Sequence, residues 1–592
     1  MLRTNLTAQS YLDTILTFLF QMLSARVHVR RAKQAAINNI FSTTGDGDNR
    51  VEAVMIPDGN LSEVDDGEPD ERPDVVIAEE EQPATIAEDD ADVPNPEYVF
   101  RWRRRQPLTV NFRDFEVDEE VGDLTPYQMF KEVFTDELLQ LITDESNRYS
   151  VEQTGESINA SFGEYEAFFG RPILLFSTIM DACEFRMYWR ADLRWSAVAD
   201  AMPLKRFESL KRFFHLSDNA KAKPHDDPGC DPLHKIRPLL DHILSWCKTI
   251  EPTQHQSIDE MMVPFKGRIK IRQYMPKKPS KWGFKIFARC SDSGIVHDFS
   301  VYCGSKTQLG KFENYPDVGF GGRVVLHLCD SLPDNKDFKV FFDNYFSSPE
   351  LVLILKNTHG IHSVGTIRTN RMKGCPLKTE KELKLSGRGS SDMMVDGNSS
   401  MIMVRWYDNR AVSFVSSYAG IEASSTVKRW SRNDKRNIEI DCPFVVREYN
   451  KFMGGVDLMD MLLSLHRVDR KSTKWYMRLV FHLLGITLNN LWLLSRRRLY
   501  ESTSKSLSLR EFIIQIASGC VDARKPKNIV SKRSVLTDVR YDGLCHFPQH
   551  QGRRLRCKRE GCGGTSVWEC GKCSLTLCLS ERSNCFTQYH IP

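Results

Sequence analysis

The 592-residue chain predicts an α/β fold, in which one mixed sheet is flanked by helices and followed by a small cysteine-rich domain. Three changes in the sequence pattern carry this prediction. Apolar residues recur at helical spacing over 121–250, β-type runs dominate 257–370, and seven of the sixteen cysteines fall within 545–592. Hydrophobic residues make up 41% of the chain, which is enough to bury a core over several domains.

Charge is distributed unevenly along the chain. Residues 1–98 contain 7 Lys/Arg and 20 Asp/Glu, a net charge of −13, so the total of +3 leaves +16 on residues 99–592. Residues 99–592 are called the basic body below. Their positive charge predicts a nucleic-acid partner, and the alternative is an ordinary solvated surface. Residues 1–98 are predicted to be a disordered acidic region. We expect a solubilising tail there; the alternatives are an arm that binds a protein partner or shields the basic body.

The residues from 121 to 250 predict a helical region. Thr125-Pro126 opens a helix whose apolar side chains are Met129, Phe130, Val133 and Phe134. Aromatic residues alternate with arginines through the rest of this region. That pattern is typical of core residues beside a solvated face, and the alternative is a surface on which bases stack. Just before this region, Arg101–Arg105 is a basic run that predicts phosphate contact or nuclear import, or is a chance linker.

The sequence changes period between 251 and 370. Two apolar runs, 283–290 and 295–303, flank the turn residues Ser291-Asp292-Ser293-Gly294 and predict a hairpin. A short strand at 339–342, a helix at 349–356 and a strand at 362–367 follow. The order of hairpin, helix, strand, helix and strand is typical of an RNase H-like catalytic domain with a mixed five-stranded sheet.

The segment 371–440 interrupts this domain. It is rich in Lys, Ser and Gly, and two runs around Asp408-Asn409 predict a β-ribbon, so we expect a β-rich insertion; a long linker is the alternative. Residues 441–461 return to the catalytic domain. The remaining predicted parts are a second helical part at 462–521 with a strong helix over 474–498, a basic linker at 522–540 suited to nuclear import or DNA-backbone contact, and a cysteine-rich domain at 541–592.

Four aspartates are the candidate catalytic residues: Asp259, Asp343, Asp457 and Asp460. Asp259 and Asp343 each follow an apolar residue of a β-type run, whereas Asp457 and Asp460 lie three apart on one predicted helix face. Any one of them alone is more typical of a strand end or a turn. Convergent carboxylates repel one another unless cations lie between them, and hard oxygen ligands suit Mg²⁺ or Mn²⁺. The four therefore predict a two-metal site that acts on phosphodiesters.

Several motifs resemble those of piggyBac transposases, over residues 121–592. In chain order these are Ser257-Ile258-Asp259-Glu260-Met261-Met262, Phe265-Lys266-Gly267-Arg268, Lys277-Lys278-Pro279, Gly283-Phe284-Lys285, Tyr449-Asn450, Met453-Gly454-Gly455-Val456-Asp457, Lys474-Trp475-Tyr476 and Asn489-Asn490. The resemblance implies an RNase H-like transposase, active or domesticated, of a family that cuts and pastes DNA at TTAA targets. It also implies helical dimerisation and DNA-binding regions and an insertion domain between the second and third catalytic aspartates.

Five basic residues in or beside these motifs are the DNA-binding candidates, and for the lysines a solvated face is the alternative: Arg268, Lys277, Lys278, Lys285 and Lys474. We expect double-stranded DNA, both element ends and target, as the partner, and a homodimer. No run reaches the ~18 apolar residues that a membrane helix needs, so no membrane partner is expected. The predicted location is the nucleus.

Eight residues near the C-terminus are candidate zinc ligands: His546, Cys557, Cys562, Cys570, Cys573, Cys578, Cys585 and His590. Eight such ligands fill two tetrahedral zinc sites, and a segment this poor in apolar residues has little else to fold around. Unrelated free thiols are the alternative, and Cys545 and His550 are alternative eighth ligands to His546. The resemblance implies a cross-braced two-zinc fold that binds the element's end sequence.

These observations predict a DDD/DDDD transposase that cleaves DNA and transfers strands with the help of a metal. The rival hypothesis is a domesticated, catalytically silent protein that binds specific DNA or chromatin. A plain RNase H-class nuclease is a third possibility, which the cysteine-rich domain disfavours.

Overall fold

The computed structural model describes residues 98–113, 115, 124–177, 185–192, 194–224, 227–276, 278–310, 315–431, 435–465, 474–499, 507–522, 541, 546–581 and 583–591. The chain divides into two compact units, Met1–Arg524 and Lys525–Pro592. The predicted acidic region up to residue 97 and the basic linker from 523 to 540 lie outside the described residues.

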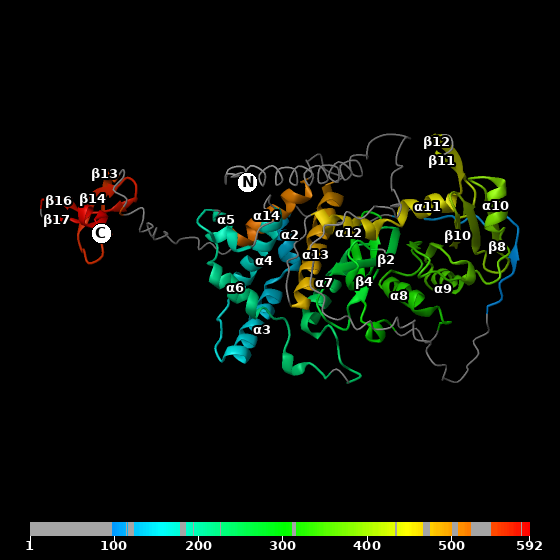
Figure 1. Ribbon diagram of the computed structural model, residues 1–592, viewed down its shortest axis with the longest axis horizontal. Helices are drawn as coiled ribbons and strands as arrows, with labels where there is room; N and C mark the ends of the chain where they lie inside the picture. The colour runs from blue at the N-terminus through cyan, green and yellow to red at the C-terminus, as the bar shows by residue number, and fades with distance from the viewer. Residues whose placement is uncertain are drawn as a thin grey trace, which may run out of the picture. The chain divides into compact units, whose positions relative to one another are not determined.

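The first unit begins with a helical part that two later helices complete (Figure 1). Its helices are α2 (Pro126–Val133), α3 (Asp136–Thr154), α4 (Phe162–Ser177), α5 (Ser196–Ala199), α6 (Leu204–Phe213), α7 (Arg237–Thr249), α13 (Trp475–Leu499) and α14 (Leu509–Asp522). Thr125 begins α2 with a capping box to Gln128, and Pro126 occupies the first turn. Buried residues of α13 and α14 share one core with those of α2 and α3, so the predicted helix over 474–498 does rejoin this region.

Helix α13 is apolar because it lies at the centre of this core. Among the described residues, it is the one helix long and apolar enough to cross a membrane, and 89% of the relevant window is buried inside the protein. Its Asn490 side chain bonds both backbone groups of Val296, at 2.9 Å and 2.8 Å, and so joins the helical part to the sheet. The apolar character of α13 is therefore explained by packing within the protein.

Five strands form the centre of a larger mixed sheet in the order β5-β4-β2-β6-β7. Strands β5, β4 and β2 pair antiparallel, and β2, β6 and β7 pair parallel. Their bounds are β2 (His255–Pro264), β4 (Trp282–Ser291), β5 (Val296–Val301), β6 (Lys339–Phe342) and β7 (His362–Thr366). The predicted hairpin is β4 and β5, and the predicted strand 339–342 is β6. A short strand, β3 (Gln273–Tyr274), pairs with the start of β4.

Helices cover both faces of this sheet (Figure 1). On one face, α8 (Gly319–Cys329) and α9 (Pro349–His359) pack with Ile258 and Phe342. On the other, α11 (Phe444–Phe452) packs with Phe341, and α12 (Gly455–Leu465) follows it directly. The predicted helix over 349–356 is α9, which ends at Gly360 in the left-handed region (φ +64°) where glycine is favoured.

The segment 371–440 is more closely joined to the sheet than the sequence predicted. Strands β8 (Ser391–Asp396), β9 (Ile402–Tyr407) and β10 (Ala411–Ser416) continue the same sheet, because β10 pairs with β7. Among the described residues the sheet therefore has ten strands, whereas five were predicted for the catalytic domain. Within this segment, β11 (Ser425–Ser431) and β12 (Arg436–Cys442) form a separate two-stranded ribbon, and α10 (Glu380–Ser386) precedes β8.

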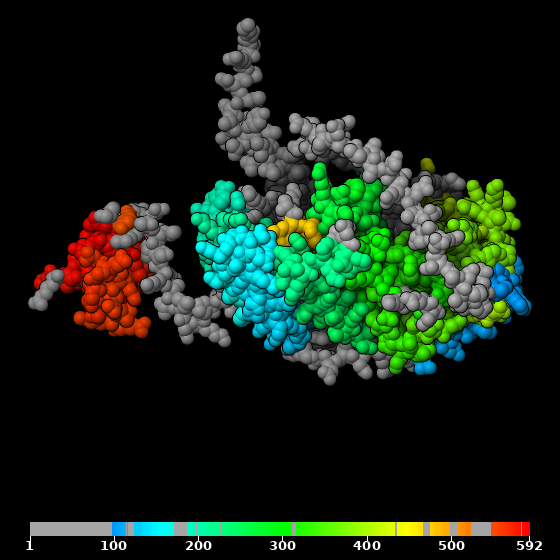
Figure 2. Space-filling model, turned by 90° about the horizontal axis from the view of Figure 1, so that it is seen from below, coloured from blue at the N-terminus to red at the C-terminus, as the bar shows by residue number. Residues whose placement is uncertain are grey.

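Residues 98–105, which include the basic run 101–105, form a strap across the edge of this sheet. Strand β1 (Trp102–Arg103) pairs with β8, and the strap, in blue, lies beside the yellow-green strands in Figure 1. In Figure 2 its blue atoms border the yellow-green surface. Arg104 forms an ion pair with Asp392, and Arg105 donates to the carbonyl oxygen of Asp396 at 3.2 Å. This part of the basic run is therefore engaged within the chain, and it covers a sheet edge that would otherwise be open.

Candidate active site and metal centres

The carboxylates of Asp259 and Asp343 are placed by two neighbouring parallel strands. Ile258 on β2 pairs with Phe342 on β6, and extending this register by one residue makes Asp259 and Asp343 neighbours. Because side chains alternate along a strand, Asp259 shares its face of β2 with Ser257 and Met261. Met261 packs in one core with Val456 of α12, so this is the face that α12 covers.

Helix α12 brings the other two aspartates to this face. Asp457 and Asp460 are three residues apart in its first two turns, and both are at least partly exposed. The helix begins at Gly455, which packs so closely on the sheet that a β carbon there would lie 2.2 Å from the carbonyl oxygen of Ser291 and 2.6 Å from Ser257 Oγ. Glycine is therefore required at the point where α12 meets β2 and β4.

Electrostatics show that the chain segments converge. Burial alone would lower the pKa of Lys278, yet attraction to nearby acids raises it overall. Those acids are, in order of effect, Asp259, Asp457, Glu260 and Asp460. Lys285 interacts in the same way with Glu260, Asp259 and Asp343, although burial lowers its pKa. The four predicted aspartates therefore share two lysines as electrostatic partners.

Each of the two strand aspartates is half-buried and also has a backbone partner. Asp259 Oδ1 accepts from the Glu260 amide at 2.7 Å, and Asp343 Oδ1 accepts from the Tyr345 amide at 2.8 Å. Burial raises the pKa of both carboxyl groups, with repulsion from Glu260 adding to it. Sequence reasoning missed Glu260 as a member of this group; its position next to Asp259 was the available signal.

The donor set suits a hard divalent cation. Five acids and two half-buried lysines gather here, so the site carries excess negative charge that a cation would offset. Among the residues that the structure describes, no three of these carboxylates bring oxygens within 4.8 Å of one another. The carboxylates therefore lie in one region of the described structure without forming a closed set of ligands.

The predicted DNA-binding residues lie in different surroundings. Arg268 is exposed. Lys278 Nζ donates to the Glu260 carbonyl oxygen at 2.9 Å, and Lys285 Nζ lies 4.6 Å and 4.7 Å from the ring centres of Phe287 and Tyr345. These two lysines therefore belong to the carboxylate site itself, while Lys277 lies outside the described residues.

Lys474 lies apart from that site, in the helical part. It donates to the Arg212 carbonyl oxygen and lies 5.7 Å from the Tyr149 ring centre. Burial, together with repulsion from three basic neighbours, lowers its pKa to about 8; the neighbours are Lys235, Arg212 and Lys211. Lys474 is therefore part of a separate basic cluster.

The second unit holds two groups of potential metal ligands. Its elements are β13 (Pro548–Arg556), β14 (Thr565–Cys570), β15 (Leu575–Thr576), β16 (Leu579–Ser580), β17 (Ser583–Asn584) and α16 (Cys585–His590). The first group is Cys557, Cys562, Cys578 and Cys585, and the second is His546, Cys570, Cys573 and His590. In each group the four ligand atoms lie within 4.8 Å of one another. All eight predicted ligands fall into these two groups.

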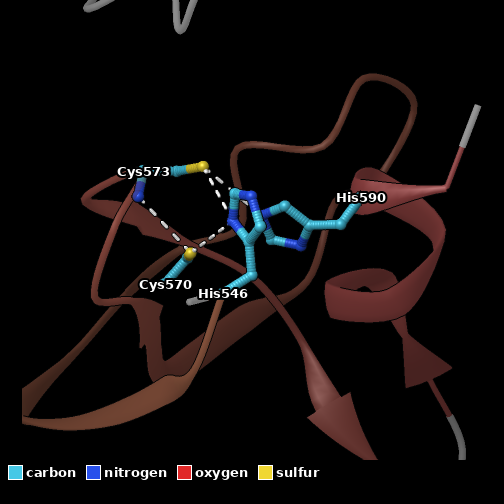
Figure 3. A group of neighbouring side chains, drawn as sticks. All are labelled: His546, Cys570, Cys573 and His590. Carbon is cyan, nitrogen blue, oxygen red and sulfur yellow. Dashed lines mark hydrogen bonds between the residues drawn. The ribbon is translucent and has the colours of Figure 1, made fainter. Parts of the chain in front are cut away.

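The distances within both groups match a tetrahedral metal site, and Figure 3 shows the second group. Cys573 Sγ lies 3.4 Å from both His546 Nδ1 and His590 Nε2, and Cys585 Sγ lies 3.5 Å from Cys562 Sγ. Ligands bound at zinc distances are about 3.5–3.8 Å apart at the corners of a tetrahedron. The residues of both groups therefore fit zinc in type, number and spacing.

The structure also pairs the ligands, which sequence left open. The two groups interleave along the chain, and the widely spaced Cys557 and Cys562 fall in the same group. His550 belongs to neither group, and its ring packs edge-on against Trp568 at 5.3 Å between centres. Cys545 lies outside the described residues. His546 is thus the histidine that completes the second group.

Comparison with known proteins gives concordant matches. The family model described as "Transposase IS4" matches residues 125–492. The human PiggyBac transposable element-derived protein 3 is 29% identical over 566 residues, 91% of this chain and 89% of the relative. The human PiggyBac transposable element-derived protein 2 is 28% identical over 497 residues, covering 80% and 78%.

A solved structure has a similar fold. It is a cryo-EM structure of a piggyBac transposase synaptic complex with hairpin DNA. The TM-score is 0.56 at 23% identity, and the match covers 69% of this chain and 83% of that one.

Proposed function

The chain belongs to the piggyBac transposase family, and from this premise we propose that it is a DDD/DDDD transposase that cleaves DNA and transfers strands at TTAA sites. The observation that carries the proposal is the convergence of three chain segments on one face of the sheet. Strands β2 and β6 and helix α12 bring Asp259, Asp343 and the Asp457/Asp460 pair to shared lysine partners. The strand order β5-β4-β2-β6-β7 supports an RNase H-like catalytic domain.

The proposed roles follow from where each side chain lies. Asp259, Asp343, Asp457 and Asp460 would hold Mg²⁺ or Mn²⁺, which when bound stabilises negative charge developing at a phosphodiester. Lys278 is tied to the Glu260 carbonyl oxygen and balances part of the acidic charge. Gly455 at the start of α12 has no side chain, so the helix backbone packs directly on Ser257 and Ser291. This contact keeps Asp457 and Asp460 close to Asp259.

The remaining parts of the proposal concern partners. The +16 charge of residues 99–592 supports binding of duplex DNA, at both element ends and target. The large helical part of the first unit is proposed as a dimerisation and DNA-binding region of a nuclear homodimer. The second unit is proposed to bind two structural zinc ions and to contact the element's end.

The test replaces one carboxylate. Asp343→Ala is expected to lower Mg²⁺- or Mn²⁺-dependent nicking and joining by at least ~10², because one metal ligand is lost, while DNA affinity is kept. The assay uses DNA that carries the protein's own element ends. Asp330→Ala is the matched control, since Asp330 is an exposed acid at the end of α8. Equal cutting by wild type and Asp343→Ala would refute the site.

The second candidate function is that of a domesticated DNA- or chromatin-binding protein without catalysis. The observation in its favour is that the similar human proteins are named as transposable element-derived. Wild-type protein that binds the element ends tightly, yet never nicks them with either metal, would establish this function instead.

A further inference from the structure

An exposed aromatic pair lies beside the carboxylate site, on the hairpin formed by β3 and the start of β4. Tyr274 on β3 and Trp282 on β4 are direct cross-strand partners, with ring centres 4.7 Å apart. Tyr274 is 51% exposed and Trp282 is 43% exposed. Large aromatic side chains usually bury their rings, so an exposed pair held by strand pairing needs an explanation.

The chain around this pair is strongly basic. The stretch from Met261 to Lys285 contains no acid and eight cations, which are Lys266, Arg268, Lys270, Arg272, Lys277, Lys278, Lys281 and Lys285. In the described part of the chain, none of them forms a salt bridge with an acidic side chain. The Arg272 guanidinium lies 4.2 Å from the Trp282 ring centre and is anchored to the carbonyl oxygens of Lys266 and Gly267. Lys278 and Lys285 face the carboxylate site, so the charge of the other described cations of this stretch is available to an anionic partner.

The hairpin is rigidly joined to the strand that carries Asp259. Its turn residue Lys278 donates to the Glu260 carbonyl oxygen at 2.9 Å. The Trp282 carbonyl oxygen accepts from the Phe265 amide at 3.0 Å, and a β carbon on Gly283 would lie 2.1 Å from the Val263 carbonyl oxygen. Close backbone packing therefore fixes the position of the aromatic pair relative to β2.

We propose that Tyr274 and Trp282 form a stacking platform for unpaired bases of the DNA held at the carboxylate site. This inference rests on the proposed function, in that DNA is the substrate. Aromatic side chains among cations are the usual combination that binds single-stranded nucleic acid, because rings stack on bases while cations meet phosphates. A base within an intact duplex hides both faces in the helix stack, so a platform of this kind selects DNA whose ends are opened or looped. The unbalanced positive charge disfavours an apolar protein partner.

The experiment measures binding by full-length protein without added magnesium, so that it does not depend on cleavage. The probes are a thymidine oligonucleotide, a blunt duplex, and a hairpin-ended duplex with 2-aminopurine in its loop. Trp282→Ala and Tyr274→Ala are each expected to weaken binding to the oligonucleotide and the hairpin about tenfold, and blunt-duplex binding less than twofold. Wild type is expected to quench the 2-aminopurine fluorescence, and Trp282→Ala to quench it much less.

The matched control is Trp430→Ala. Trp430 is another exposed tryptophan, 58% exposed, on the separate ribbon of β11 and β12. The Trp430→Ala variant is expected to bind all three probes as wild type does. Trp282→Phe keeps a stacking ring and is expected to restore most of the affinity, which separates stacking from a folding defect.

Three outcomes would overturn the proposal. Unchanged oligonucleotide and hairpin affinity in both alanine variants would show that no base stacks there. Equal loss for all three probes would assign the pair to duplex binding. A change in oligomeric state with unchanged DNA binding would make it a contact between copies. If wild type binds and cuts duplex DNA in any of these cases, the result refutes the stacking role of Tyr274 and Trp282 and leaves the proposed transposase function intact.

Discussion

Gly455 lies against Ser291 with no space for a side chain: a β carbon on the glycine would stand 2.2 Å from the serine carbonyl oxygen. This contact joins the start of α12 to β4, beside β2. It sets the distance between a helix that carries two aspartates and a strand that carries a third. The position of Asp457 relative to Asp259 therefore depends on a residue with no functional group.

Gly455→Ala is expected to push α12 away from the sheet. Overpacking of this kind costs about 1–3 kcal/mol of folding stability, and the displaced Asp457 should lower DNA cleavage by at least ~10². Denaturant unfolding and the cleavage assay measure the two effects.

Gly454→Ala is the matched control, because nothing lies within 4 Å of a β carbon at that neighbouring glycine. The control is expected to cleave like wild type. If the two variants behave alike, the close approach of α12 does not position the aspartates.

The two metal groups of the second unit are expected to fill independently. Wild type should contain two zinc ions per chain, and Cys578→Ser and Cys573→Ser should each contain one, because each removes a ligand from a different group. Elemental analysis of the full-length protein measures this.

His550→Ala is the control and should keep both zinc ions, since His550 contacts Trp568 and lies in neither group. If His550→Ala lost one zinc ion while His546→Ala kept both, His550 would replace His546 as the eighth assigned ligand. Zinc-free wild type would remove the two-site assignment altogether.

The strap is expected to loosen in acid through Asp396. Burial favours the neutral acid, but hydrogen bonds from Tyr98, Ser399 and the Arg101 amide outweigh it and lower the pKa of Asp396 from 3.8 to about 2. Because the folded pKa is depressed, this carboxylate stabilises the fold above pH 3.8, and the contribution is lost as pH falls towards 2.

Asp396→Asn should therefore lower the free energy of unfolding by about 1–2 kcal/mol at neutral pH and flatten its fall between pH 4 and 2. Urea unfolding of wild type and variant at several pH values measures the difference. Tyr98→Phe removes one of the donors and should show a smaller change in the same direction. Superimposable pH profiles for wild type and Asp396→Asn would contradict this role.

Local patterns were sufficient to predict many elements. Strand β6 begins and ends where the run Lys339–Phe342 predicts, because a short apolar run before a turn has few other solutions. Helix α9 ends at Gly360 for an equally local reason. The resemblance to piggyBac transposases, carried by motifs such as Ser257–Met262, correctly predicted the family.

Other features could not be predicted from local patterns. Strands β8 to β10 read as an insertion, and nothing in their own residues indicates that β10 pairs with β7. The basic run 101–105 left phosphate contact, nuclear import and a chance linker open, and nothing local indicates that Arg104 pairs with Asp392, almost three hundred residues later. The exposure of Trp282 could not be predicted either, because a tryptophan in a β-type run is as compatible with a core position as with a surface one.

The sequence by itself determined the chemistry available to this protein: four aspartates in family motifs, eight zinc-type ligands and a basic body behind an acidic arm. Residue types carry charge and ligand preference wherever they lie. Tertiary structure alone decided which groups meet: Asp259 beside Asp343, α12 on β2, and the ligands sorted into two groups of four. These meetings depend on strand register and close packing between distant segments, and such contacts leave no local pattern for a single sequence to reveal.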